Sequence, residues 1–136
     1  KKGAKVMIKR DMLPESEELL EDKLLVVKEK NPSFQRAKAL FPEASEFAGD
    51  MSGHDLVFIW GEGVDLQVSK LPQKSIMLTS RKFAGVEKIN FVFPITTWLE
   101  RSGTFTNFKG VESSFLKAFE PAGSALDAEK LFRMLK

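Results

Sequence analysis

The stretch Leu56-Val57-Phe58-Ile59-Trp60-Gly61 places five large apolar residues in a row and ends in a glycine. A continuous apolar run of this length, bounded by turn residues, is typical of a strand inside a parallel sheet. Two further runs of this kind follow at residues 75–79 and 89–93, and each leads into a polar or proline-containing loop. The three runs predict three core strands of one sheet.

Weaker signals precede these strands. Residues 4–9 alternate in hydropathy, which predicts a strand. A short helix is predicted from Leu13-Pro14 and the acidic residues that follow. The apolar run 24–27 predicts a further buried strand. Asn31-Pro32 is typical of a helix start, because Asn can cap the first turn and Pro has no N–H to satisfy. We expect this helix to end at Pro42 and to bury one stripe of apolar side chains: Phe34, Ala37, Leu40 and Phe41.

The pattern becomes irregular after Pro94. It predicts one helical turn at residues 96–100, a sharp turn at Ser102-Gly103 and a polar loop over residues 104–109. A final helix is expected after Ser124 as its N-cap, with an apolar face made by Ala128, Leu131, Phe132 and Leu135. The fold class is therefore α/β: an open, mainly parallel sheet flanked by helices, with an irregular C-terminal extension and a final helix, in a single domain over residues 1–136.

Composition limits the chemistry open to this chain. Of its 136 residues 43% are hydrophobic and 29% charged, which is ordinary for a soluble globular protein. There is no cysteine to form a disulfide or hold an iron–sulfur cluster, and His54 is the only histidine. The net charge of +2 provides no strong field for a polyanion. We therefore expect no catalytic residue, metal or cofactor in this chain, no nucleic-acid partner and no direct insertion into a membrane.

Three local motifs have both a functional and a structural interpretation. Gly61-Glu62-Gly63 follows a strand as in dinucleotide-binding folds, but Leu66 occupies the place of the third glycine, which favours a tight turn with positive φ. His54 could act as a general base, although a loop histidine bonded to backbone is the commoner case. Ser80-Arg81-Lys82 ends a predicted strand, where open α/β sheets bind ligands, and could hold an anion or simply face water.

Residues 90–107 resemble the large subunits of the molybdopterin oxidoreductase family, in which a strand ADVVLP leads into E-x-x-G-T-x-T-N. The matching pieces are Asn90-Phe91-Val92-Phe93-Pro94, Thr97-Trp98-Leu99-Glu100 and Gly103-Thr104-Phe105-Thr106-Asn107. The order of the strands before them also agrees, so that the resemblance covers roughly residues 55–112. Within the family, the chain most resembles the C-terminal part of the large iron–sulfur subunit of NADH:quinone oxidoreductase, respiratory complex I. In such a segment Glu100 can hold a backbone group or an arginine.

This resemblance implies a non-catalytic structural and docking domain in an assembly that passes electrons from NADH to quinone. The parent subunit would carry iron–sulfur clusters in other domains, and the isolated fragment would be inactive. Its partners would be those domains and neighbouring complex I subunits, on the cytoplasmic side and peripheral to the inner membrane. Because the chain starts at Lys1-Lys2-Gly3 without an initiator Met, we expect it to be a piece of a longer protein, and the resemblance implies that this piece is the C-terminal fragment of a larger subunit.

An alternative stays open within the same family. The chain could be the pterin-nucleotide-binding portion of an active molybdopterin or tungstopterin oxidoreductase, with four residues on the nucleotide: Ser80, Arg81, Thr104 and Asn107. Two departures weaken this alternative. The arginine that commonly follows the family's Asn is absent from residues 108–112, and Glu62 and Asp65 add negative charge where a phosphate would lie.

Overall fold

The computed structural model describes residues 4–9, 31, 33–61, 63–107 and 109–134. They fall into two compact units, the first within residues 1–48 and 104–114 and the second within residues 49–103 and 115–136. The strand predicted at residues 24–27 and the helix predicted after Pro14 lie outside the described residues, and the single domain expected over residues 1–136 stays a prediction. No helix in the described ranges has both the length and the apolar character needed to cross a bilayer.

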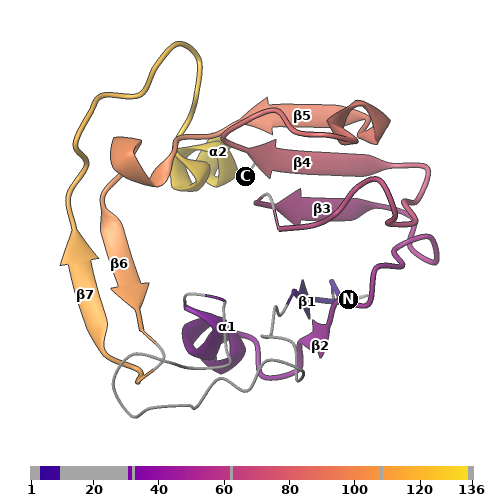
Figure 1. Cartoon of the computed structure of the whole chain (residues 1–136), viewed down its shortest axis with the longest axis horizontal. Coiled ribbons are helices and arrows are strands. Elements are labelled where there is room, and N and C mark those ends of the chain that lie inside the picture. The colour runs from indigo at the N-terminus through magenta and orange to yellow at the C-terminus, as the bar shows by residue number, and fades with distance from the viewer. Residues whose placement is uncertain (1–3, 10–30, 32, 62, 108, 135–136) are drawn as a thin grey trace, which may run out of the picture. The chain divides into compact units, whose positions relative to one another are not determined.

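The second unit is built on a parallel three-stranded sheet. Its strands are β3 (Val57–Trp60), β4 (Ser75–Thr79) and β5 (Phe91–Pro94), hydrogen-bonded in the order β3-β4-β5 (Figure 1). In this register Trp60 lies opposite Leu78 on the neighbouring strand. The three apolar runs of the sequence therefore form the strands that were predicted, and the α/β fold class is confirmed.

Both connections between these strands are short crossovers. Residues 61–74 join β3 to β4, and residues 80–90, with the 3₁₀ helix η1 (Val86–Lys88), join β4 to β5. Crossovers between parallel neighbours are right-handed almost without exception, so two that step in the same direction cover the same face of the sheet. On the two strands β3 and β4, three apolar side chains that point to this covered face are buried: Val57, Ile59 and Met77.

Two glycines shape these crossovers. Gly61 leaves β3 with φ of +93°, which confirms the tight turn with positive φ predicted there. Gly85 has φ of +87°, and a Cβ atom on it would lie 2.8 Å from the Cβ of Leu66. Leu66 is completely buried, so Gly85 is required both by its backbone conformation and by the space available.

Helix α2 (Ala128–Met134) packs against β4 and the residues that follow β5. It is capped by Asp127, whose Oδ1 accepts the backbone N–H of Glu129 at 2.8 Å. The N-cap predicted at Ser124 is therefore wrong, because Ser124 lies in a turn and the helix begins only after residue 126, which pairs with Ile95. The core cluster joins three buried residues with a half-buried fourth: Leu78, Ile95, Leu131 and Leu126.

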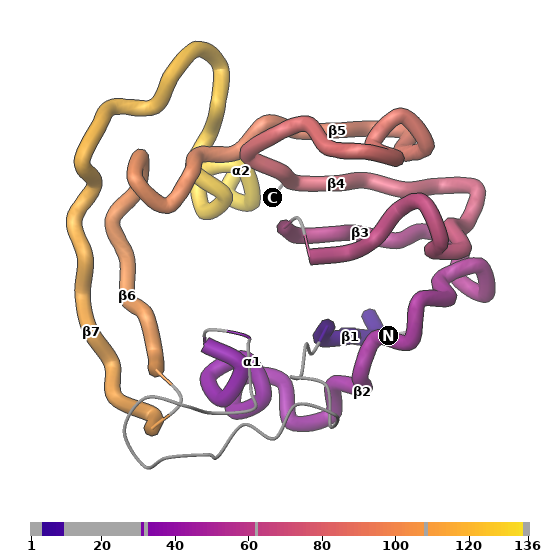
Figure 2. Tube along the Cα trace, in the orientation of Figure 1, coloured from indigo at the N-terminus to yellow at the C-terminus, as the bar shows by residue number. Residues whose placement is uncertain are grey.

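The 3₁₀ helix η2 (Trp98–Glu100) confirms the helical turn predicted after Pro94. The sharp turn predicted at Ser102-Gly103 is wrong, and the loop predicted over residues 104–109 is wrong for residues 104–106. Strand β6 (Gly103–Thr106) begins there and pairs with β7 (Glu112–Phe115), and the trace reverses direction between them (Figure 2). Gly103 is crowded instead, since a Cβ atom there would lie 3.1 Å from the Phe115 ring.

The first unit pairs β1 (Met7–Ile8) in parallel with β2 (Ser45–Glu46) and contains α1 (Phe34–Leu40). Helix α1 is present where a helix was predicted and ends before Pro42, but it begins at Phe34 with Ser33 as its N-cap, so the cap predicted at Asn31 is wrong. Its predicted apolar stripe is only partly buried, because Phe34 is buried whereas Leu40 and Phe41 are exposed.

Candidate functional site

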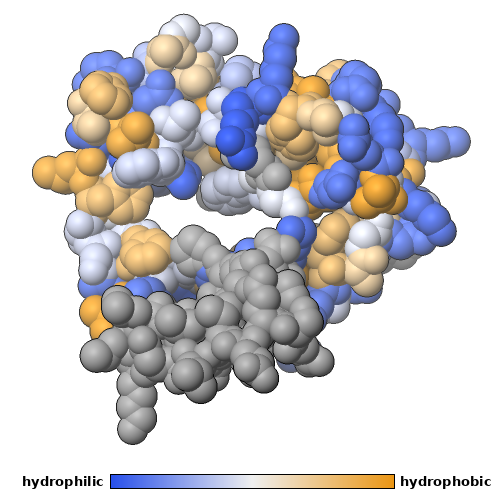
Figure 3. All heavy atoms as spheres, in the orientation of Figure 1, coloured by the Kyte–Doolittle hydropathy of each residue, from blue (hydrophilic) through white to orange (hydrophobic). Residues whose placement is uncertain are grey.

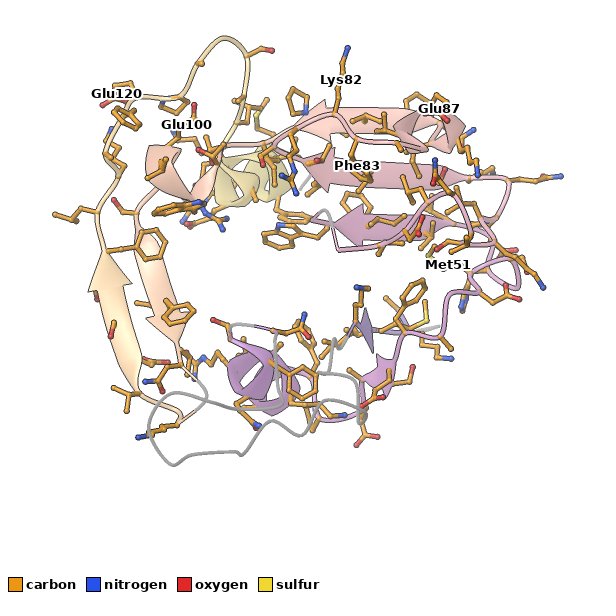
Figure 4. The ribbon with its side chains drawn as sticks, viewed as in Figure 1. Met51, Lys82, Phe83, Glu87, Glu100 and Glu120 are labelled. Carbon is orange, nitrogen blue, oxygen red and sulfur yellow. The ribbon has the colours of Figure 1, made fainter. Side chains whose placement is uncertain are left out.

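The carboxyl edge of the three-stranded sheet holds the first two residues of the expected nucleotide site. Ser80 and Arg81 follow β4 directly and are exposed. The buried Thr79 fixes the shape of this loop, because its Oγ1 donates to the Arg81 carbonyl at 2.8 Å and accepts the Arg81 N–H at 3.3 Å. Lys82 then extends outward, away from the ribbon (Figure 4). The loop has the charge to meet an anion, and its role in binding one stays a prediction.

The other two residues of that expected site belong to the first unit. Thr104 lies exposed on β6. Asn107 holds the turn between β6 and β7, since its Oδ1 accepts the backbone N–H of Lys109 at 2.9 Å and of Val111 at 3.0 Å. The side-chain oxygen of Asn107 therefore serves the hairpin itself. The four expected residues thus divide between the two units, two in each.

Glu100 ties together two segments that are distant in sequence. Its Oε2 accepts the backbone N–H of Thr97 at 2.8 Å and the Thr97 hydroxyl at 2.9 Å, while its Oε1 accepts the N–H of Ala122 at 3.1 Å (Figure 4). The N–H of Thr97, then that of Ala122, then the Thr97 hydroxyl lower the pKa of this carboxyl below its ordinary value. Glu100 therefore acts as a structural clamp on backbone groups, and a backbone group is one of the two kinds of partner expected for it.

We expect the amide proton shifts of Thr97 and Ala122 to titrate together, with a midpoint below the ordinary glutamate pKa of about 4.3. Because the folded pKa is lowered, the clamp contributes stability above the unfolded pKa and loses it as the pH falls through the folded pKa. Both titrations should disappear in Glu100→Gln and persist in Glu87→Ala, which removes an exposed carboxyl on η1. Separate midpoints for the two amides, measured by NMR, would contradict a shared clamp.

The strongest surface feature lies on the face of the sheet opposite the crossovers. Apolar side chains that share this face, together with one from α2, form what we call the aromatic face: Leu56, Phe58, Trp60, Ile76, Phe91, Phe93 and Phe132. The exposed fractions of Phe58, Trp60 and Phe91 are 42%, 59% and 63%. The Phe132 ring lies 5.9 Å from that of Phe58 and 5.7 Å from that of Trp60 and covers only part of the face.

At the amino ends of β4 and β5 the aromatic face sinks into an open hollow of about 510 Å³. Its lining combines apolar side chains with a lysine and a few polar groups: Leu56, Gln73, Lys74, Ser75, Ile76, Asn90 and Phe91. On the face of the molecule drawn in Figure 3, hydrophobic atoms lie in separate groups between hydrophilic ones. The aromatic face and its hollow therefore form the best candidate for a functional site.

Sequence reasoning missed this face because it treated the three runs as core strands. The sequence does place large apolar residues at every position of 56–60, but a run without polar residues does not show which face of the strand lacks a cover.

His54 lies in a loop, where its backbone N–H donates to the Met51 carbonyl at 3.2 Å. Within the described ranges no three acidic or histidine side chains gather in a group that could hold a metal ion.

Comparison with known proteins returned no match to any family model, curated protein or solved structure.

Proposed function

We propose that this chain is a non-catalytic structural and docking domain. The observation that carries the proposal is the aromatic face. Phe and Trp side chains have roughly 150–250 Å² of surface each, so the exposed fractions of this face leave on the order of several hundred Å² of apolar surface. Patches of that size are the largest that a typical monomer exposes and often mark interaction sites. A standard interface buries about 800 Å² per partner, for which this face would supply the apolar centre.

The assembly proposed for this domain is respiratory NADH:quinone oxidoreductase, which passes electrons from NADH to quinone. Support comes from the motif resemblance over residues 90–107 and from the backbone-holding roles of Glu100 and Asn107, which suit a structural motif kept without a ligand. The parent would be the large subunit with its iron–sulfur clusters in other domains. The partners would be those domains and neighbouring subunits, at the cytoplasmic side of the inner membrane.

Comigration tests this assignment. In membranes of the source organism, solubilised and separated on native gels, the chain should migrate with NADH:quinone oxidoreductase activity. Phe91→Ser should reduce comigration at least severalfold without lowering the thermal midpoint, because Phe91 is largely exposed. Phe119→Ser, which alters an equally exposed phenylalanine in a loop, is the matched control and should comigrate normally. A chain that migrates apart from this activity would contradict the assignment.

Calorimetric titration with molybdopterin dinucleotide separates the proposal from the active-enzyme alternative. We expect no binding by the chain. Micromolar binding that is lost in Arg81→Ala or Asn107→Ala would instead support a pterin-nucleotide site.

A further inference from the structure

The hollow at the end of the aromatic face is built to take an apolar side chain. Leu56, Ile76 and Phe91 provide its apolar walls. Two of its polar residues already bond to each other, because Asn90 Oδ1 accepts both the backbone N–H and the hydroxyl of Ser75, at 2.8 Å and 2.9 Å, and the Asn90 backbone N–H donates to Ser75 Oγ at 3.2 Å. A polar occupant would therefore find few free partners on the floor of this hollow.

Lys74 places a positive charge beside these walls, which favours a partner with a negative charge. It lines the hollow, is exposed, and forms no ion pair with a carboxylate among the described residues. An ammonium group at the edge of an interface steers and orients a partner that carries the opposite charge. A carboxylate next to the inserted apolar side chain would meet Lys74 as the side chain enters the hollow.

The length of the face matches a short helix. Trp60 lies four positions after Leu56 along an extended chain, a distance of about 13 Å, and a helix advances about 10 Å over seven positions. Apolar side chains at positions i, i+4 and i+7 of a helix would therefore reach from the hollow towards Phe132. Amphipathic helices bind hydrophobic grooves through this spacing.

We infer that the aromatic face binds an amphipathic helix of a partner protein, and that this helix places a large apolar side chain in the hollow and an adjacent carboxylate on Lys74. The inference rests on the proposed docking function and specifies the chemistry of the partner. It follows from the hydrogen-bonded Ser75–Asn90 pair, the apolar walls and the exposed ammonium group of Lys74 on one continuous face.

Synthetic peptides test the inference on the full 136-residue chain. Three 18-residue helical peptides are titrated by NMR: one with leucines at i, i+4 and i+7 flanked by glutamates, the same peptide with lysines for the glutamates, and the acidic peptide with its leucines scrambled. The acidic peptide should bind at least tenfold more tightly than the other two and should shift the signals of Leu56, Ile76 and Phe91.

Charge reversal provides the decisive comparison. Lys74→Glu should reverse the preference in favour of the basic peptide, whereas Lys82→Glu, the same change at the other end of β4, should leave the preference intact. Equal binding of acidic and basic peptides, an unchanged preference in Lys74→Glu, or a molecular mass that doubles with concentration because a second copy covers the face would each overturn the inference.

The peptide experiment and the comigration experiment test different claims, so a negative result in one leaves the other claim standing. Comigration with NADH:quinone oxidoreductase but no peptide preference would remove only the inference about the helix. A peptide preference that depends on Lys74, in a chain that migrates apart from that activity, would remove only the assignment to this assembly.

Discussion

Leu78→Ala is expected to lower the free energy of unfolding by about 3–5 kcal/mol, the cost of truncating a fully buried leucine. Leu78 has no exposed surface and packs with Ile95 and Leu131 in the cluster that joins β4 to α2. A helix of seven residues is marginal without tertiary contacts, so the cavity should also loosen α2. Hydrogen exchange of the Leu131 amide, which donates to the Asp127 carbonyl at 3.0 Å, should become faster.

Denaturant unfolding monitored by fluorescence measures this loss. Leu116→Ala is the control, because Leu116 is 85% exposed and its truncation should change the free energy by less than about 0.5 kcal/mol. If Leu78→Ala cost no more than Leu116→Ala, the cluster would not be the core of the second unit.

Gly85→Ala is expected to destabilise the fold by about 2–5 kcal/mol, because two costs act together. The left-handed conformation of Gly85 costs an alanine about 1–2 kcal/mol. The new Cβ would also lie 2.8 Å from Leu66 Cβ and 3.1 Å from the Leu66 carbonyl carbon, and overpacking of this kind typically costs about 1–3 kcal/mol.

Gly49→Ala isolates the first of these costs. Gly49 has φ of +86°, almost the same as the +87° of Gly85, but a Cβ atom there meets nothing within 4 Å. The loss for Gly49→Ala should therefore be only about 1–2 kcal/mol. If Gly85→Ala and Gly49→Ala shifted the denaturation midpoint equally, the contact of the new Cβ atom with Leu66 would contribute nothing to the loss of stability.

The parallel sheet was predictable because its strands are continuous apolar runs in which no helical period competes. Their partial exposure was not predictable, since burial depends on what covers each face and the run 56–60 is apolar on both. Strand β6 was missed because Gly103-Thr104-Phe105-Thr106 is short, mostly polar and begins with a glycine, a composition that favours a loop.

The cap of α2 and the hydrogen bonds of Glu100 were likewise predictable from the sequence only in part. Ser124 and Asp127 are both good capping residues, and only the pairing of residue 126 with Ile95 decides that the helix begins after Asp127. A backbone partner for Glu100 was predictable from its spacing to Thr97. Its bond to Ala122 was not, because the two residues are 22 positions apart and meet only in the folded chain.

The pairing of Leu126 with the end of β5 also bears on how the protein is made. The cluster of Leu78, Ile95 and Leu131 lacks its last member until residues 126–134 have left the ribosome. Until then the nascent chain would carry β4 and β5 without α2, and exposed apolar strands of this kind aggregate readily. Productive synthesis of the second unit should therefore depend on chaperones that hold the nascent sheet, and ribosome stalling just before residue 126 should prolong their binding.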